Sequence, residues 1–166
     1  MLADRGDQAS MSDVAAAAGV ARATVYRYFP NREALLETLG RLAVEDVGDR
    51  LRAARLDEID VADGLERAVR AFVTVGDAFV VVARDREHTE SPEFDERIVT
   101  PVRDLLTRGQ RSGDIRDDVP AAWLTDALFG IVVSVVGSAQ ALGSDDATAA
   151  IASVFFDGAR STADQK

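Results

Sequence analysis

The sequence AGVARATVYRYFPNREAL, residues 18–35, marks the boundaries of two short helices and of the turn between them. Gly19 should end a first helix, because glycine readily adopts the backbone conformation found just past helix ends. Pro30 should stop a second helix at about residues 22–28, since proline disfavours helical geometry in the residue before it. Asn31 is a good N-cap for a third helix. Two short helices joined by a three- or four-residue turn containing glycine form a helix-turn-helix unit.

The flanking residues complete this unit. Ser10 and Asp13 form a capping-box pattern, which predicts the first short helix at about residues 11–17. The third helix should run from Asn31 to about Ala54, with apolar residues three and four positions apart. We therefore assign residues 1–55 to a helix-turn-helix DNA-binding domain that includes a long connecting helix.

Residues 56–166 have the pattern of a further set of helices. Strand signals are nearly absent, and apolar residues recur at helical spacing. Ser91 followed by Pro92 is a typical helix start, and Pro101 should kink or restart that helix. The expected helices lie at about 61–85, 91–113, 120–142 and 145–160. The predicted fold class is all-α, with the helix-turn-helix head followed by a C-terminal helical ligand-binding and dimerisation bundle at residues 56–166.

The net charge of −10 lies entirely outside the first domain. Residues 1–55 hold eight arginines and eight acidic residues, so this domain is neutral. Within it, the segment from Arg5 to Arg32 has four arginines and two acidic residues. A neutral-to-basic head on an acidic body is compatible with DNA contact made by the head alone.

The composition also bears on other classes of protein. The chain has no cysteine, which excludes disulfides and thiolate metal sites. The first ten residues are polar and do not resemble a signal peptide. Residues 121–143 are apolar enough to raise the question of a membrane span, but they include Asp126, Gln140 and three glycines and lack basic flanks. We interpret this stretch as a buried interface helix and expect a soluble, cytoplasmic protein.

The segment SMSDVAAAAGVARATVYRYFPNREALL, from Ser10 to Leu36, resembles the DNA-binding domain of TetR-family (tetracycline-repressor-like) transcriptional regulators. The matching positions are Val14-Ala15, Ala18-Gly19-Val20, Thr24-Val25-Tyr26, Tyr28-Phe29 and Arg32-Glu33-Ala34-Leu35. So many matches at fixed spacing are a specific signal, and they cover about the first quarter of the chain. The resemblance implies a regulator without enzymatic activity or cofactor, which binds a double-stranded DNA operator as a homodimer.

Within this segment the residues divide into packing and reading positions. Four apolar residues are expected to hold the two short helices together: Val14, Val20, Val25 and Phe29. The opposite face should reach the bases, where an arginine can make a bidentate contact to guanine. The resemblance implies that the two tyrosines and Arg32 hold backbone phosphates. The predicted DNA-binding residues are Ser10, Arg22, Ala23, Thr24, Tyr26, Arg27, Tyr28 and Arg32. Alternatively, the tyrosines only cover a small core and the arginines only solvate a surface.

Two features depart from the family pattern. Ala21 occupies the N-cap of the second helix, where the family usually has serine, so a side-chain cap worth about 1 kcal/mol is missing. The family's first helix is also longer than the segment MLADRG that precedes the capping box here. Without that helix, Val14, Val25 and Phe29 should be partly uncovered. Our hypothesis is that the natural start lies upstream of Met1.

The resemblance implies a dimer built by the last two helices of each subunit, as a four-helix interface. Small residues that permit close helix approach are expected there, beside apolar residues of the last helix. The predicted interface residues are Gly130, Ser134, Gly137, Ala141, Ile151 and Phe155. The alternative is that these helices form the core of the single chain.

A pocket for a small apolar or aromatic effector should lie inside the helical body. The predicted lining residues are Phe72, Val75, Gly76, Phe79, Trp123 and Phe129. Aromatic residues at helical spacing are more often part of an ordinary core than of a pocket. The effector would release DNA by favouring a tilt of the long helix that begins after Asn31.

Two other functions remain possible at this stage. An enzyme is disfavoured, since His88 with Asp85 makes neither a metal site nor a nucleophile-base pair. The second is a helical dimer that binds a small molecule or a protein but has impaired DNA binding. A steep dependence of DNA affinity on salt distinguishes this rival from a regulator.

Overall fold

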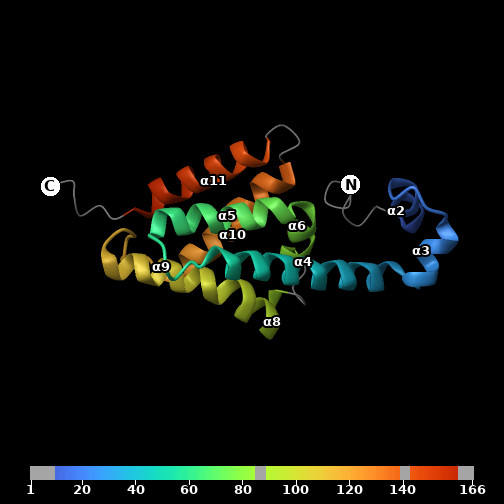
Figure 1. Ribbon diagram of the computed structural model, residues 1–166, viewed down its shortest axis with the longest axis horizontal. Coiled ribbons are helices and arrows are strands. Elements are labelled where there is room, and N and C mark those ends of the chain that lie inside the picture. Colours follow the sequence, from blue (N-terminus) through green and yellow to red (C-terminus); the bar gives the residue numbers. More distant parts are fainter. Residues whose placement is uncertain (1–9, 85–88, 139–142, 161–166) are drawn as a thin grey trace.

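The computed structural model describes residues 10–84, 89–138 and 143–160. Two short helices, α2 (Met11–Ala17) and α3 (Arg22–Tyr28), form one end of the molecule, and a helical bundle forms the other (Figure 1). Helix α4 (Arg32–Ala54) extends from the short pair into the bundle. At 1.5 Å per residue, α4 is about 34 Å long. Within the described ranges no strand is present beyond an isolated bridge between Ile115 and Arg160, and the predicted all-α class is confirmed.

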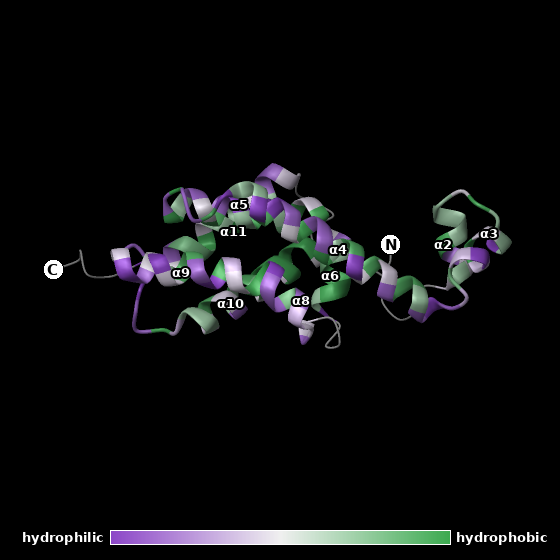
Figure 2. Ribbon diagram, turned by 60° about the horizontal axis from the view of Figure 1, so that its bottom comes forward, coloured by the Kyte–Doolittle hydropathy of each residue, from purple (hydrophilic) through white to green (hydrophobic). Residues whose placement is uncertain are grey.

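The bundle is made of α4 and the helices that follow it. These are α5 (Val61–Val75), α6 (Asp77–Ala83), α8 (Pro92–Phe94), the π-helical stretch η2 (Asp95–Val99), α9 (Thr100–Ser112), α10 (Ala121–Ser138) and α11 (Ser144–Ala159). Helix α4 packs against α5, α6 and η2, and α11 packs along α5. Figure 2 shows hydrophobic segments gathered where α4, α6 and α10 meet.

We expected a single helix from Val61 through the valine run. This prediction is wrong, because the helix breaks at Gly76. This residue has φ 62° and ψ −130°, a conformation that costs little only for glycine. Its N–H still donates to the Phe72 carbonyl, and its carbonyl accepts from the Phe79 N–H. The break therefore turns the chain from α5 into α6 and brings two aromatic side chains from consecutive helices together.

Pro101 does not restart its helix as expected, because the helix passes through this residue by way of a π-helical stretch. The five residues before α9 form η2, in which the Thr100 N–H donates to the Asp95 carbonyl, one residue further back than in an α-helix. The wider turn accommodates a residue that lacks an N–H and whose ring would clash with a carbonyl in regular α geometry. The helix that begins at Pro92 thus continues to Ser112, and Gly113, with φ 85°, ends it as predicted.

Four phenylalanines meet in the centre of the bundle. The ring centroids of Phe72 and Phe79 are 4.8 Å apart, and Phe129 lies 5.5 Å from Phe72. Phe94, from α8, adds a fourth ring 6.3 Å from Phe129. Phe72, Phe79 and Phe94 are fully or almost fully buried. This four-phenylalanine cluster joins the consecutive helices α5 and α6 to α8 and to α10, which lies later in the sequence.

Helix α10 is unusually apolar for a helix with so much free surface. Its 18 residues have a mean hydropathy of 1.6. By length and composition alone, the helix is long and apolar enough to cross a membrane. One face packs into the bundle through Leu124, Leu128 and Val132. Only 22% of its residues are buried within the chain, and most of its other large apolar residues are half-buried against the core, so part of its apolar surface remains exposed. The C-terminal end expected near Leu142 falls on residues 139–142, which lie outside the described ranges.

Candidate nucleic-acid interface

The capping box and Gly19 determine how α2 and α3 sit together. Ser10 accepts a hydrogen bond from the Asp13 N–H at 3.2 Å, and Asp13 Oδ2 accepts one from the Ser10 N–H at 2.9 Å. Gly19 has φ 67° in the turn, where other residues are strained. Met11, Ala15 and Val25 form a small core between the helices. Phe29 and Leu35 pack against it and attach the start of α4.

The outward face of α3 carries two arginine-tyrosine pairs. Arg22 Nη2 donates to the Tyr26 hydroxyl at 3.4 Å, and its guanidinium lies 5.2 Å from the ring centroid. Arg27 and Tyr28 form the second pair, with a hydrogen bond of 3.2 Å and a centroid distance of 5.0 Å. All four side chains are exposed. Arginines held over aromatic rings keep N–H groups available to bases and phosphates.

The start of α4 adds a third cationic group. Asn31 Oδ1 accepts a hydrogen bond from the Ala34 N–H at 2.8 Å and caps the helix. Arg32 follows at the first helical position and is half-buried. A helix N-terminus beside an arginine favours a phosphate, because the unpaired backbone N–H groups and the helix dipole act together.

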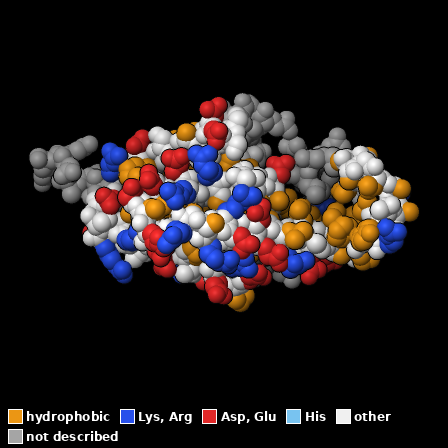
Figure 3. Space-filling model, viewed as in Figure 1, with side chains coloured by type: hydrophobic (Ala, Val, Ile, Leu, Met, Phe, Trp, Pro, Cys, Tyr) orange, Lys and Arg blue, Asp and Glu red, His pale blue; other side chains and the backbone are white. Residues whose placement is uncertain are grey.

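The charge of this region differs from that of the bundle. Residues 10–32 contain three arginines and one aspartate, a net charge of +2. In Figure 3, acidic and basic side chains are interspersed over the bundle, whereas the end formed by α2 and α3 is mostly hydrophobic, with a basic patch at its tip. Anionic DNA would therefore meet repulsion from the body and attraction from this end.

Several details of the head differ from the sequence-based expectations. Val20 is 42% exposed in the turn, so its expected role as a packing residue is wrong. Val25 is buried, although we expected it to be partly uncovered, while Val14 and Phe29 are half-buried. Thr24 is half-buried rather than fully outward, and Ala23 is exposed. The expectation about the first helix concerns residues 1–9, which lie outside the described ranges.

Helix α3 has no side-chain cap at Ala21, as the sequence indicated. Replacing Ala21 with serine should stabilise α3 by about 1 kcal/mol, since its hydroxyl can accept a bond from a free N–H of the first turn. Hydrogen exchange should show greater protection of the α3 amides and no change in α11. Equal protection in both proteins would show that the head's stability does not depend on this cap.

The residues predicted to line an effector pocket are brought together only in part. Phe72, Phe79 and Phe129 meet in the four-phenylalanine cluster, and Val75 and Gly76 lie at the adjoining helix break. Trp123 is 69% exposed on the first turn of α10, so its placement inside the body is wrong. Phe94 belongs to the cluster but was missed, because no local pattern links it to residues beyond its own helix.

The residues predicted for the dimer interface also separate into groups. Gly130 and Ser134 are exposed on α10. Ile151 and Phe155 are 1% and 5% exposed, so they belong to the core of the single chain and their assignment to an interface is wrong. Gly137 lies against Arg84 and Val80 of its own chain. Ala141 lies outside the described residues.

The comparison with known proteins points to one family. The family described as bacterial regulatory proteins, tetR family, matches residues 1–39. The transcriptional repressor LfrR of Mycolicibacterium smegmatis is 28% identical over 80% of this chain and 85% of its own. The regulator NfxB of Pseudomonas aeruginosa is 23% identical over 78% of this chain and 72% of its own.

Solved structures agree with the sequence comparison. The structure of the TetR-like regulator LfrR from Mycobacterium smegmatis in complex with proflavine has a TM-score of 0.71 and 25% identity, and the match covers 95% of this chain and 88% of that one. The regulator PfmR from Thermus thermophilus shares the fold, with a TM-score of 0.68, 20% identity and coverage of 91% and 89%.

A helix-turn-helix with an exposed arginine-tyrosine face, joined by one long helix to a helical body, defines a DNA-binding transcriptional regulator. More particularly, residues 1–39 match the tetR family of bacterial regulators, and the chain is similar to TetR-like regulators over most of its length. It is accordingly a regulator and not an enzyme.

Proposed function

We propose that this regulator is a ligand-responsive repressor that acts in the cytoplasm and binds a pseudo-palindromic operator as a homodimer. The observation that carries the proposal is the outward face of α3, where two arginine-tyrosine pairs stand free of the chain's own core. Residues 1–55 supply the reading head in this proposal, and residues 56–166 supply the effector and dimer surfaces.

The uncovered surface of α10 and α11 supports dimerisation. Trp123 and Val154 are 69% and 65% exposed, and Gly130 and Ser134 leave room for another helix. A symmetric pair places the same patch on both subunits, so four helices would bury this surface. Two heads about 34–36 Å apart then fit successive major grooves.

Replacing Val154 with glutamate should shift the dimer to monomers, because it places a charge in the proposed apolar interface. Sedimentation velocity at micromolar concentration would measure the shift. The matched control is Ala62→Glu, which adds the same charge at an exposed position of α5. If the Val154→Glu protein stays dimeric, the dimer interface does not include this part of α11.

The effector proposal rests on the four-phenylalanine cluster. LfrR was solved with proflavine, an aromatic molecule, and its structure covers most of this chain. Rings from α5, α6, α8 and α10 pack directly against one another, so a flat apolar ligand would enter by separating them. Because α6 and α5 both pack against α4, such a ligand could bias the tilt of the helix that carries the head.

The first test is fluorescence anisotropy with DNA that flanks the protein's own gene, measured over a salt series. A steep loss of affinity with salt is expected, with a slope close to the number of phosphates contacted. The same experiment with unrelated DNA gives the specificity ratio. If no fragment binds at low salt, the protein is a helical sensor without DNA-binding activity.

A further inference from the structure

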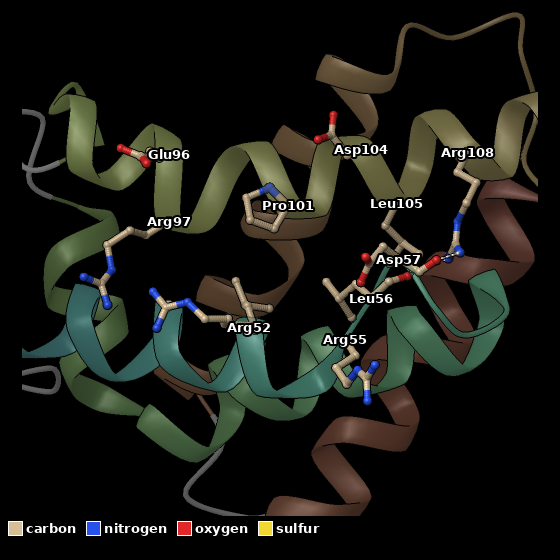
Figure 4. Close-up of a pocket in the computed structure, with 12 residues that line it drawn as sticks. Arg52, Arg55, Leu56, Asp57, Glu96, Arg97, Pro101, Asp104, Leu105 and Arg108 are labelled. Atoms are coloured by element: carbon tan, nitrogen blue, oxygen red, sulfur yellow. Dashed lines mark hydrogen bonds between the residues drawn. The ribbon is translucent and has the colours of Figure 1, made fainter.

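A cavity lies away from the four-phenylalanine cluster, where the last turns of α4 face η2 and α9 (Figure 4). Its volume is about 510 Å³, enough for a small organic molecule. None of the four phenylalanines lines this α4–α9 cleft. It is therefore distinct from the effector site proposed above.

The floor of the α4–α9 cleft is apolar. Leu51 and Leu56 come from the end of α4 and the turn after it, and Leu105 and Pro101 face them from α9. The three leucines are 2–6% exposed and firmly packed, so the floor is fixed by the core of the bundle. Such a surface favours the apolar body of a ligand.

One end of the cleft is cationic. Arg52 and Arg97 come from opposite walls, and Figure 4 shows their side chains extending toward one another. Both donate to the same oxygen, Asp49 Oδ1, at 2.9 and 2.8 Å. The two guanidinium groups therefore share the carboxylate of Asp49. Arg97 has a second, longer ion pair with Glu93, whose Oε1 lies 3.7 Å from Arg97 Nη1. The remaining N–H groups of Arg52 have no hydrogen-bond partner among the described residues.

Arg97 is held in place by its surroundings. A Cβ atom at position 48 would lie 2.8 Å from Arg97 Nε, so Gly48 is what allows this side chain to lie directly on α4. Arg97 Nε itself is buried and has no hydrogen-bond partner among the described residues. The guanidinium is thus positioned before any ligand arrives, which lowers the entropic cost of binding.

The other charged residues favour one orientation of a ligand. The carboxylates of Glu96 and Asp104 point away from α4 in Figure 4. Arg108 donates to the backbone carbonyls of Leu56 and Asp57 at 2.7 and 2.9 Å and is engaged with the chain. The Asp57 carboxylate lies at the other end of the cleft, farther from Arg97 than the Arg52 side chain is. It would repel an anion placed at that end.

We propose that the α4–α9 cleft binds an organic anion, whose acidic group lies between Arg52 and Arg97 and whose apolar body lies over Leu105 and the adjoining leucines. This site goes beyond the proposed function, because it uses neither the four-phenylalanine cluster nor the DNA-binding face. Asp49 competes with the ligand for both arginines.

The test compares two fluorescent probes with the same aromatic body, anilinonaphthalene sulfonate and the uncharged N-phenylnaphthylamine. In the full chain, Arg52→Gln should weaken sulfonate binding about three-fold and Asp49→Asn should strengthen it about three-fold, as expected for partly exposed charges. Both side chains are more than 60% exposed, so the fold should tolerate the changes. Binding of the uncharged probe should not change.

The controls are Arg50→Gln and Asp46→Asn, an exposed ion pair on α4 that does not line the cleft. They alter the net charge by the same amounts and should leave the affinity for the sulfonate unchanged. Opposite effects of Arg52→Gln and Asp49→Asn that the controls lack would support the site. Equal effects in both pairs, or no effect in either, would overturn it.

Discussion

Replacing Arg27 with alanine is expected to weaken binding to the operator by roughly ten- to hundred-fold, the value of one good bidentate contact to a base. Arg27 stands exposed on the last turn of α3, and its partner Tyr28 is 66% exposed beside it. Since neither side chain contributes to the small core of the head, the variant should fold normally. Anisotropy with the cognate operator and with single-base variants would measure both affinity and specificity.

The same measurement separates two roles for Arg27. A base contact predicts relaxed specificity at one position of the operator, whereas a phosphate contact predicts a uniform loss and a salt slope smaller by about one. The matched control is Arg41→Ala, an exposed arginine on α4 that pairs with Glu45. If Arg27→Ala binds DNA as tightly as Arg41→Ala does, the arginines of α3 only solvate a surface.

The head could be predicted from sequence because its boundaries depend on local chemistry. Ser10, Gly19 and Asn31 act through backbone atoms no more than three residues away or through their own φ, so the pattern alone placed α2, α3 and the start of α4. The exposure of Val20 could not be seen in the same way. The exposure of Val20 depends on the direction in which the turn points its side chain, and that direction follows from the left-handed backbone of Gly19.

The body was predicted less well, because helical periodicity does not say what an apolar face will contact. Ile151 and Phe155 were assigned to a partner, but they fill the core against α5, while Val154 of the same helix is exposed. The break at Gly76 was missed for a related reason. A glycine within a run of apolar residues is compatible with a continuous helix, and the break is seen only once α6 packs against α4 and α10.

Replacing Phe72 with alanine is expected to destabilise the protein by about 3–5 kcal/mol, the usual cost of removing a buried phenylalanine. Phe72 is fully buried, and it contacts Phe79 at 4.8 Å and Phe129 at 5.5 Å. For a chain of this size the melting temperature should fall by roughly 10 °C. Thermal unfolding at a fixed protein concentration would measure it, because the proposed dimerisation would make the transition concentration-dependent.

The control is Phe156→Ala, which removes the same side chain from a half-buried position on α11, where the ring lies 4.9 Å from the Arg160 guanidinium. Its cost should be less than half that of Phe72→Ala, because fewer contacts are lost and water can fill the space. The comparison also bears on the effector. If the cluster is core and effector site at once, Phe72→Ala loses both stability and binding of a flat aromatic probe such as proflavine. If stability falls but the probe still binds with unchanged affinity, the cluster only holds the bundle together, and the effector site lies elsewhere.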